Sequence, residues 1–239
     1  MSEAVLNACG LTKRFRKRKV LDGLDFELAR GAVTVLLGRN GAGKSTFLKL
    51  ALGVLKADGG SIAVCGHDPA RKPRVVRQRL GYVPDKPDVY DWMTPAELYR
   101  FLKPQYPTWN DDLVARTVAS LGVPATTPFG ALSRGEGMKA MLVAALAPEP
   151  ELLLLDEPFA GLDPVAREEV LRGVIGEIRA EERTVLCTTH DLDVAARIAD
   201  RVALLSCGKV ARHGATAEVL GDESAAPERM RQILAETPA

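Results

Sequence analysis

The chain has 239 residues, 46% hydrophobic and 26% charged, which suits a soluble α/β protein with a sizeable core. Lys and Arg number 32 against 31 Asp and Glu, and a net charge of +1 argues against a protein that neutralises many nucleic-acid phosphates. The four cysteines form no metal-ligand or CxxC spacing, and no apolar run approaches a membrane span of about 20 residues, so we expect a reduced, cytosolic chain.

The first 84 residues alternate short apolar segments with turns. The pattern predicts strands at Val20–Leu28, Val33–Leu37 and Ser61–Val64, and an apolar helix after Gly43. Just before the first of these strands lies Lys13–Lys19 (KRFRKRK), six cations around a single aromatic residue, Phe15. Such a cluster is compatible with a nucleic-acid or membrane contact, and equally with a solvated turn.

A phosphate-binding loop is the strongest motif in the chain. The sequence GRNGAGKST matches G-x-x-x-x-G-K-[ST] and stands between a predicted strand and a predicted helix, which is the context this loop requires. Backbone N–H groups and the helix N-terminus would surround an anion, Lys44 would reach the β and γ phosphates, and Ser45 would offer a hydroxyl to Mg²⁺. The predicted nucleotide-binding residues of the loop are Gly38, Arg39, Asn40, Gly41, Ala42, Gly43, Lys44, Ser45 and Thr46.

Prolines punctuate the next segment, and its pattern is helical. Thr94–Leu102 has a cap, a proline at the first helical position and an acid in the first turn, and Asp111–Leu121 is a second helix candidate. We therefore predict a mainly helical insertion over residues 85–133.

Helices and strands alternate again from about Leu132. The predicted helices are Glu136–Leu146, Pro164–Ala180 and Leu192–Ile198, and the predicted strands are Leu152–Leu155, Thr184–Thr188 and Arg201–Ser206. Continuous apolar strands between helices indicate a parallel sheet that is buried on both faces.

Polar residues follow two of these strands at the edge where ligands bind in open α/β sheets. Asp156 is placed to hold Mg²⁺, and Glu157 to orient or deprotonate the attacking water. His190 follows the strand at Thr184–Thr188 and is a candidate sensor of the γ-phosphate. The other interpretations are solvated acids at a strand exit and a structural histidine.

In this order, the motifs resemble those of the nucleotide-binding subunit of ATP-binding cassette (ABC) transporters, over roughly Val5 to Leu220. The family's signature, normally LSGGQ, corresponds to LSRGE at Leu132–Glu136, and Gly161–Leu162–Asp163 matches the family's D-loop. The resemblance implies that Ser133 and Gly135 contact ATP bound to the phosphate loop of a second subunit in a head-to-tail dimer.

The sequence departs from the family pattern at three positions. Arg134 replaces the first signature glycine, Glu136 replaces glutamine, and Asp85 stands where the family has glutamine or glutamate. The resemblance implies that Asp85 contacts the metal or its water, although its side chain is shorter. Phe15 stands where the family usually has a tyrosine that stacks on adenine, and a phenylalanine ring can also stack. The competing interpretation is a charged turn with Phe15 tucked inward.

The resemblance implies a single ABC ATPase domain over residues 1–239. Within it, 1–84 and 134–220 form an α/β core with a mainly parallel sheet and an N-terminal antiparallel part. Residues 85–133 form a helical subdomain and 221–239 a C-terminal tail. The implied function is hydrolysis of ATP with Mg²⁺, coupled by dimer closure to movement of a substrate through separate transmembrane permease subunits.

The motifs are similar to those of ATPase subunits of bacterial exporters, so export is the expected direction of transport. The implied location is cytoplasmic, peripheral on the inner face of the cell membrane. The chain would dimerise with itself or with a second ABC subunit, and would not bind nucleic acid. A soluble ABC-type ATPase acting on nucleic acid or translation is the alternative function.

Overall fold

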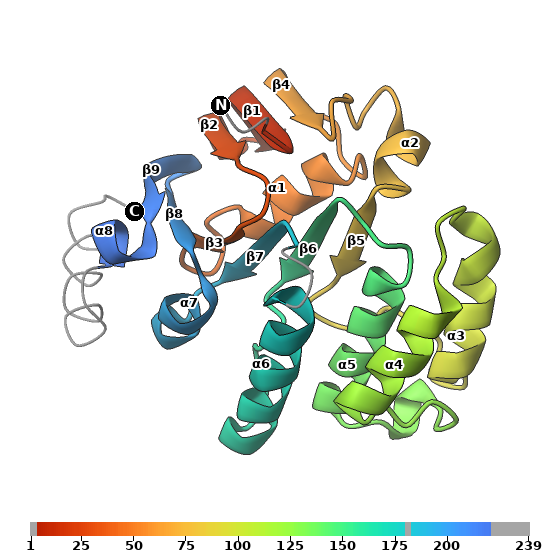
Figure 1. Cartoon of the computed structure of the whole chain (residues 1–239). Coiled ribbons are helices and arrows are strands. Elements are labelled where there is room, and N and C mark those ends of the chain that lie inside the picture. Colours follow the sequence, from red (N-terminus) through yellow and green to blue (C-terminus); the bar gives the residue numbers. More distant parts are fainter. Residues whose placement is uncertain (1–3, 180–182, 221–239) are drawn as a thin grey trace. The chain divides into compact units, whose positions relative to one another are not determined.

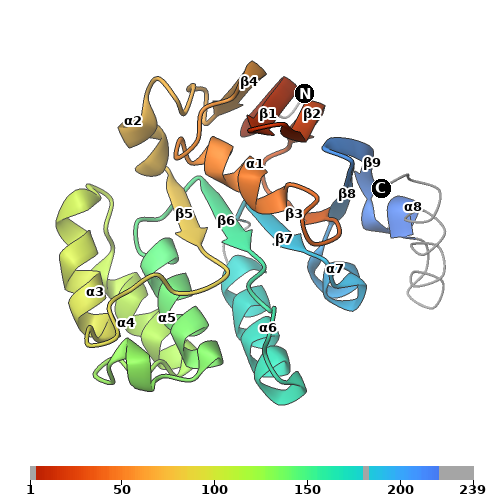
Figure 2. The ribbon, with the colours of Figure 1, turned by 180° about the vertical axis from the view of Figure 1, so that it is seen from behind.

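The computed structural model describes residues 4–179 and 183–220, so the tail predicted at 221–239 lies outside the described residues. Contacts divide the chain into two units, Met1–Arg77 with Thr184–Ala239, and Gln78–Arg183. Figures 1 and 2 show the ribbon from opposite sides. The helical segment predicted at 85–133 lies within the second unit, and its boundaries stay a prediction.

The first unit begins with a three-stranded antiparallel sheet in the order β2-β1-β4. Its strands are β1 (Leu6–Phe15), β2 (Arg18–Leu28) and β4 (Gly59–Val64). Apolar residues at alternating positions of β2, such as Leu24, Phe26 and Leu28, are buried, as expected for a sheet with one covered face. The ring of Phe26 packs edge-on against Phe47, with 5.6 Å between ring centroids.

Four strands of a second sheet belong to the same unit, in the order β7-β3-β8-β9. β3 pairs in parallel with β7 and β8, and β9 is antiparallel to β8. Every residue of β3 and β7 is buried, which explains why both strands read as nearly continuous apolar runs. The elements are β3 (Val33–Leu37), α1 (Lys44–Ala51), α2 (Pro73–Arg77), β7 (Val185–Thr189), α7 (Leu192–Ile198), β8 (Arg201–Ser206), β9 (Lys209–Ala215) and α8 (Thr216–Leu220).

The second unit combines two parallel strands with a group of helices. β5 and β6 pair in parallel. α5 packs against α3, α4 and α6, and Figure 1 shows α3 and α4 beside α5 in yellow and green. The elements are β5 (Leu80–Val83), α3 (Pro95–Leu102), a 3₁₀ turn (Lys103–Gln105), α4 (Asp111–Leu121), a second 3₁₀ turn (Phe129–Ala131), α5 (Arg134–Leu146), β6 (Leu152–Asp156) and α6 (Pro164–Arg179).

Helix starts follow the capping signals of the sequence. The side chain of Thr94 accepts the N–H of Glu97 and the Glu97 carboxylate accepts the N–H of Thr94, so the predicted start of α3 is confirmed. α5 begins at Arg134, two residues before the predicted start, because Ser133 and Glu136 form the same reciprocal arrangement.

The basic stretch differs most from the prediction. Lys13–Lys19 is a hairpin end in which β1 runs to Phe15 and β2 starts at Arg18, with Arg14 opposite Lys19 and Phe15 opposite Arg18. Cations are poor strand signals in a sequence, but at the end of a hairpin their side chains stay in solvent while the backbone pairs.

The fold class is confirmed: an α/β chain with a mainly parallel sheet, an N-terminal antiparallel part and inserted helices. None of the helices within the described ranges is long and apolar enough to span a bilayer.

Candidate functional site

The phosphate loop joins the end of β3 to α1 with a backbone that requires glycine. Gly41 and Gly43 have φ values of 81° and 110°. A Cβ on Gly43 would lie 2.9 Å from Leu21 Cδ2 and 3.1 Å from the Val20 carbonyl oxygen, and one on Gly38 would lie 2.6 Å from the Leu205 carbonyl oxygen. The glycines therefore let the loop turn and let neighbouring strands approach it.

Lys44 is buried inside this loop, among backbone carbonyl groups. Its side chain is 5% exposed, and Nζ donates to the carbonyl oxygens of Gly38 at 2.6 Å and Arg39 at 3.2 Å. A buried ammonium is stable only among acceptors or anions. The predicted cationic position is thus formed by the loop itself.

The start of α1 is suited to an anion. Its N-cap, Gly43, supplies no side-chain acceptor, whereas α3, α4, α5 and α7 begin with acceptors from Thr94, Asn110, Ser133 and Asp191. The first N–H groups of α1 therefore point along the helix axis with the positive end of its dipole and no side-chain cap. Ser45 is half-buried in the first turn of this helix.

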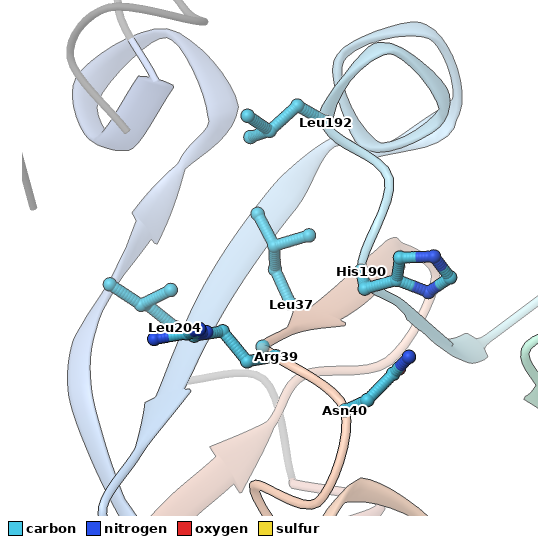
Figure 3. A pocket seen from close by; sticks show the side chains of 7 residues that line it. Leu37, Arg39, Asn40, His190, Leu192 and Leu204 are labelled. Atoms are coloured by element: carbon cyan, nitrogen blue, oxygen red, sulfur yellow. The ribbon is translucent and has the colours of Figure 1, made fainter. Parts of the chain in front are cut away.

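His190 lies beside the phosphate loop, as the sequence predicted from its place after a strand. The Gly38 N–H donates to the Thr189 carbonyl at 3.2 Å, which ties the loop to the end of β7. A cavity of about 350 Å³ lies here, and Figure 3 shows Asn40 and His190 among the side chains that line it. The cavity is lined by Leu37, Gly38, Arg39, Asn40, His190, Leu192 and Leu204.

Phe15 is not tucked inward. Its side chain is 45% exposed, and the ammonium of Lys13 lies 5.6 Å from the centre of its ring. The cation on the ring is thus a lysine. An exposed ring with one face against a cation can still offer its other face to a flat ligand.

Arg18 was not among the predicted site residues. This residue pairs with Phe15 across the hairpin, and its Nη2 lies 3.9 Å from the position that a Cβ on Gly41 would occupy. Arg18 thus brings a cation to the phosphate loop. A helpful signal would have been the register of the hairpin, because it places residues 15 and 18 side by side.

The second unit carries the acidic residues. Asp156 ends β6 and is only 2% exposed, and Glu157 follows with φ of 47°. A left-handed backbone costs a non-glycine residue about 1–3 kcal/mol and is frequent at functional sites. A buried carboxylate beside a strand end fits a divalent cation such as Mg²⁺, which prefers oxygen ligands.

Asp85 lies at the same end of this strand pair, after β5. Burial raises the pKa of the Tyr82 hydroxyl, and the negative charges of Asp156 and then Asp85 raise it further. Tyr82 lies opposite Leu154 in the β5–β6 register, two residues before Asp156. The charges of Asp156 and Asp85 therefore both act on the Tyr82 hydroxyl. Asp85 itself is exposed.

The signature stretch forms the start of α5. Ser133 caps the helix by accepting the Glu136 N–H at 3.2 Å, and the Glu136 carboxylate accepts the Ser133 N–H at 2.8 Å. The Ser133 hydroxyl and, second, the Ser133 backbone N–H stabilise the Glu136 carboxylate and hold the pKa of Glu136 below its ordinary value. Gly135 is buried, with the Val170 Cγ2 3.5 Å from its would-be Cβ. Glu136 therefore replaces glutamine without loss of the helix start.

Three comparisons with known proteins bear on this site. A family model described as ABC transporter matches residues 21–160. The chain is 35% identical over 209 residues to a fluoroquinolones export ATP-binding protein of Mycobacterium tuberculosis, covering 86% of this chain and 69% of the relative. It is 37% identical over 218 residues to an aliphatic sulfonates import ATP-binding protein of Rhodococcus jostii, covering 87% and 73%.

A solved structure described as the ATP binding subunit of an ABC transporter superposes with a TM-score of 0.84 at 28% identity. It covers 96% of this chain and 99% of its own.

Proposed function

The chain belongs to the ABC transporter family as an ATP-hydrolysing, ATP-binding subunit, and on this premise we propose how its residues bind and use the nucleotide. The observation that carries the proposal is the phosphate loop, with a buried Lys44 and an α1 start that has no side-chain cap. Residues 38–46 hold the phosphates, with N–H groups and Lys44 stabilising their negative charge.

The hairpin end binds the rest of the nucleotide. Phe15 stacks on the adenine, since its ring is half exposed at the end of β1. Arg18 faces Gly41 and adds a positive charge beside the phosphate chain. Lys13 and Lys19 do not add charge beside the phosphates, because their ammonium groups pair with Asp58 at 3.0 Å and Asp22 at 2.8 Å.

The acidic residues supply the chemistry. Ser45, Asp156 and Asp85 would hold Mg²⁺ or its waters, and the ion would supply positive charge to the β and γ phosphates. Glu157 orients the attacking water and accepts its proton, and His190 contacts the γ-phosphate beside the loop. The strained backbone at Glu157 supports a functional role for this residue.

Two subunits complete the cycle in this proposal. A second cassette, either a copy of this chain or a different ABC subunit, would pair head to tail, so that Ser133 and Gly135 of each meet the ATP of the other. Their place at the start of α5 supports this role, because the positive end of the helix dipole favours a negatively charged ligand even where Ser133 caps the first turn. The comparisons give no support to the nucleic-acid alternative.

The chain would sit on the inner face of the cell membrane, and closure of the dimer would drive a conformational change in the permease subunits. We propose export as the direction of transport, in line with the exporter-like motifs and the fluoroquinolones export relative. Purification of the tagged chain from detergent-solubilised membranes should retain a polytopic protein. ATP-driven accumulation of substrate inside inverted vesicles would confirm export, and accumulation inside right-side-out vesicles would refute it.

Glu157→Gln tests the mechanism. The variant should bind ATP, form a dimer that persists during size-exclusion chromatography, and hydrolyse ATP about a hundredfold or more slowly, because only the proton acceptor is lost. Glu149→Gln, the same change at an exposed position before β6, should behave as wild type. Near-normal turnover of Glu157→Gln would exclude Glu157 as the base. Lys44→Ala should lose ATP binding, and unchanged affinity would refute the phosphate-loop assignment.

A further inference from the structure

Two of the positions at which this sequence departs from the family pattern contact each other. The Nη2 of Arg134 donates a hydrogen bond to the carbonyl oxygen of Asp85 at 3.0 Å. The residues are 49 positions apart in the sequence, and both lie in the second unit. Arg134 and Asp85 each look like an isolated substitution in the sequence, but the hydrogen bond shows that the two residues interact.

The guanidinium of Arg134 also covers Gly161. A Cβ on Gly161 would lie 3.0 Å from Nη1 and 3.2 Å from Cζ of Arg134, and Gly161 has φ of 68°. Glycine at this position thus leaves room for the guanidinium plane. One side chain therefore meets both the segment after β5 and the loop after β6.

The topology explains why one residue reaches both segments. β5 and β6 are parallel neighbours, so the chain leaves both strands at the same edge of the sheet. α5 precedes β6 and runs back along the strands, which brings its first residue, Arg134, to that edge.

Arg134 occupies a position that does not favour a cation. It is the first residue of α5, where the helix dipole disfavours positive charge, and its buried Nε has no hydrogen-bond acceptor among the described residues. The contacts with Asp85 and Gly161 offset this disadvantage.

We propose that Arg134 is a positioning residue that fixes the backbone of Asp85 and the loop at Gly161 against the start of α5. This inference rests on the proposed function, in which Asp85 serves the metal. The carboxylate of Asp85 is one methylene shorter than that of a glutamate, so its reach depends on where its backbone is held. Arg134 holds that backbone by its carbonyl.

A double-mutant cycle tests the proposal. Arg134→Met keeps the aliphatic stem and removes the charge and the donors. It should lower kcat about tenfold and raise the Mg²⁺ concentration that gives half-maximal turnover, while the Kd for ATP stays within about twofold. In the Asp85→Asn background, the same change should alter kcat less than about threefold. An equal factor in both backgrounds, or no effect in either, would overturn the proposal.

Hydrogen exchange gives a readout that does not depend on turnover. Arg134→Met should speed deuterium uptake in peptides that cover 84–88 and 159–163, whether or not those segments serve ATP hydrolysis. Arg100→Met, an exposed arginine of α3 in the same unit, is the matched control and should leave exchange and turnover unchanged. Unaltered exchange in both peptides of Arg134→Met would overturn the positioning role.

The outcome is separable from the proposed function. If Lys44→Ala and Glu157→Gln behave as wild type, the proposed function fails, but faster exchange in Arg134→Met would still establish the contact. Arg134→Lys keeps the charge and guards against a variant that fails to fold, because its single ammonium cannot match a guanidinium that meets two segments. It should also show faster exchange and the loss of turnover, and full activity of Arg134→Lys would refute the need for a guanidinium.

Discussion

Arg18→Gln should weaken ATP binding about three- to tenfold. The Nη2 of Arg18 lies 3.9 Å from the would-be Cβ of Gly41, so a phosphate held by the loop lies within reach of its charge. At about 5 Å, two unit charges attract by about 0.8 kcal/mol in water and about 3 kcal/mol near a protein surface. Arg18 is exposed, so we expect the net effect at about 0.7–1.4 kcal/mol, which corresponds to that range of affinity.

A series of ligands distinguishes this effect from a general disturbance of the hairpin. Isothermal titration with ATP, ADP and adenosine should show that Arg18→Gln weakens the two phosphorylated ligands and spares adenosine, whereas Phe15→Ala weakens all three. Lys17→Gln, which changes an exposed neighbouring cation in the same turn, should have little effect. If Lys17→Gln matched Arg18→Gln, the charge of the whole stretch would matter and the specific position of Arg18 would not.

Two further predictions concern the loop and the start of α5. Gly43→Ala should unfold at lower urea concentration and lose ATP binding, because φ of 110° and a Cβ 2.9 Å from Leu21 Cδ2 together cost about 2–5 kcal/mol; wild-type stability would show that the loop is not constrained as described. Glu136→Gln should be less stable than wild type at pH 6, and the difference should shrink as the pH falls below the ordinary glutamate value of 4.5. The lowered pKa of Glu136 means that its charged form stabilises the fold, and this contribution is lost as the carboxylate becomes protonated. A pH-independent difference in urea unfolding would contradict the capping role.

The parts of the fold that the sequence predicted are those governed by local patterns. Apolar runs gave the buried strands, and the Thr94 and Glu97 pair gave the start of α3, because capping depends on residues three apart. The phosphate loop was recognisable because its glycines and lysine occupy fixed positions along the chain. The position of His190 beside the loop was predictable from its place after a strand, since strand ends define the ligand-binding edge.

The remainder depends on contacts between distant residues. The hairpin at Lys13–Lys19 was missed because cations carry no strand signal, and with it the register that places Arg18 beside the loop. The bond between Arg134 and Asp85 joins positions 49 residues apart, and no periodicity in the sequence indicates it. The start of α5 at Arg134 belongs with the local patterns, because Ser133 and Glu136 have the same three-residue spacing as Thr94 and Glu97.

The glycine at the start of α1 has a thermodynamic consequence. A helix end that a bound anion completes makes the nucleotide a part of the folding equilibrium, since ligand that binds only the folded chain stabilises it by mass action. At a free nucleotide concentration one hundred times Kd, this amounts to about 2.7 kcal/mol. The melting temperature of this chain should therefore rise with nucleotide concentration like a titration curve, and the same concentration would set how fast proteases remove the chain in the cell.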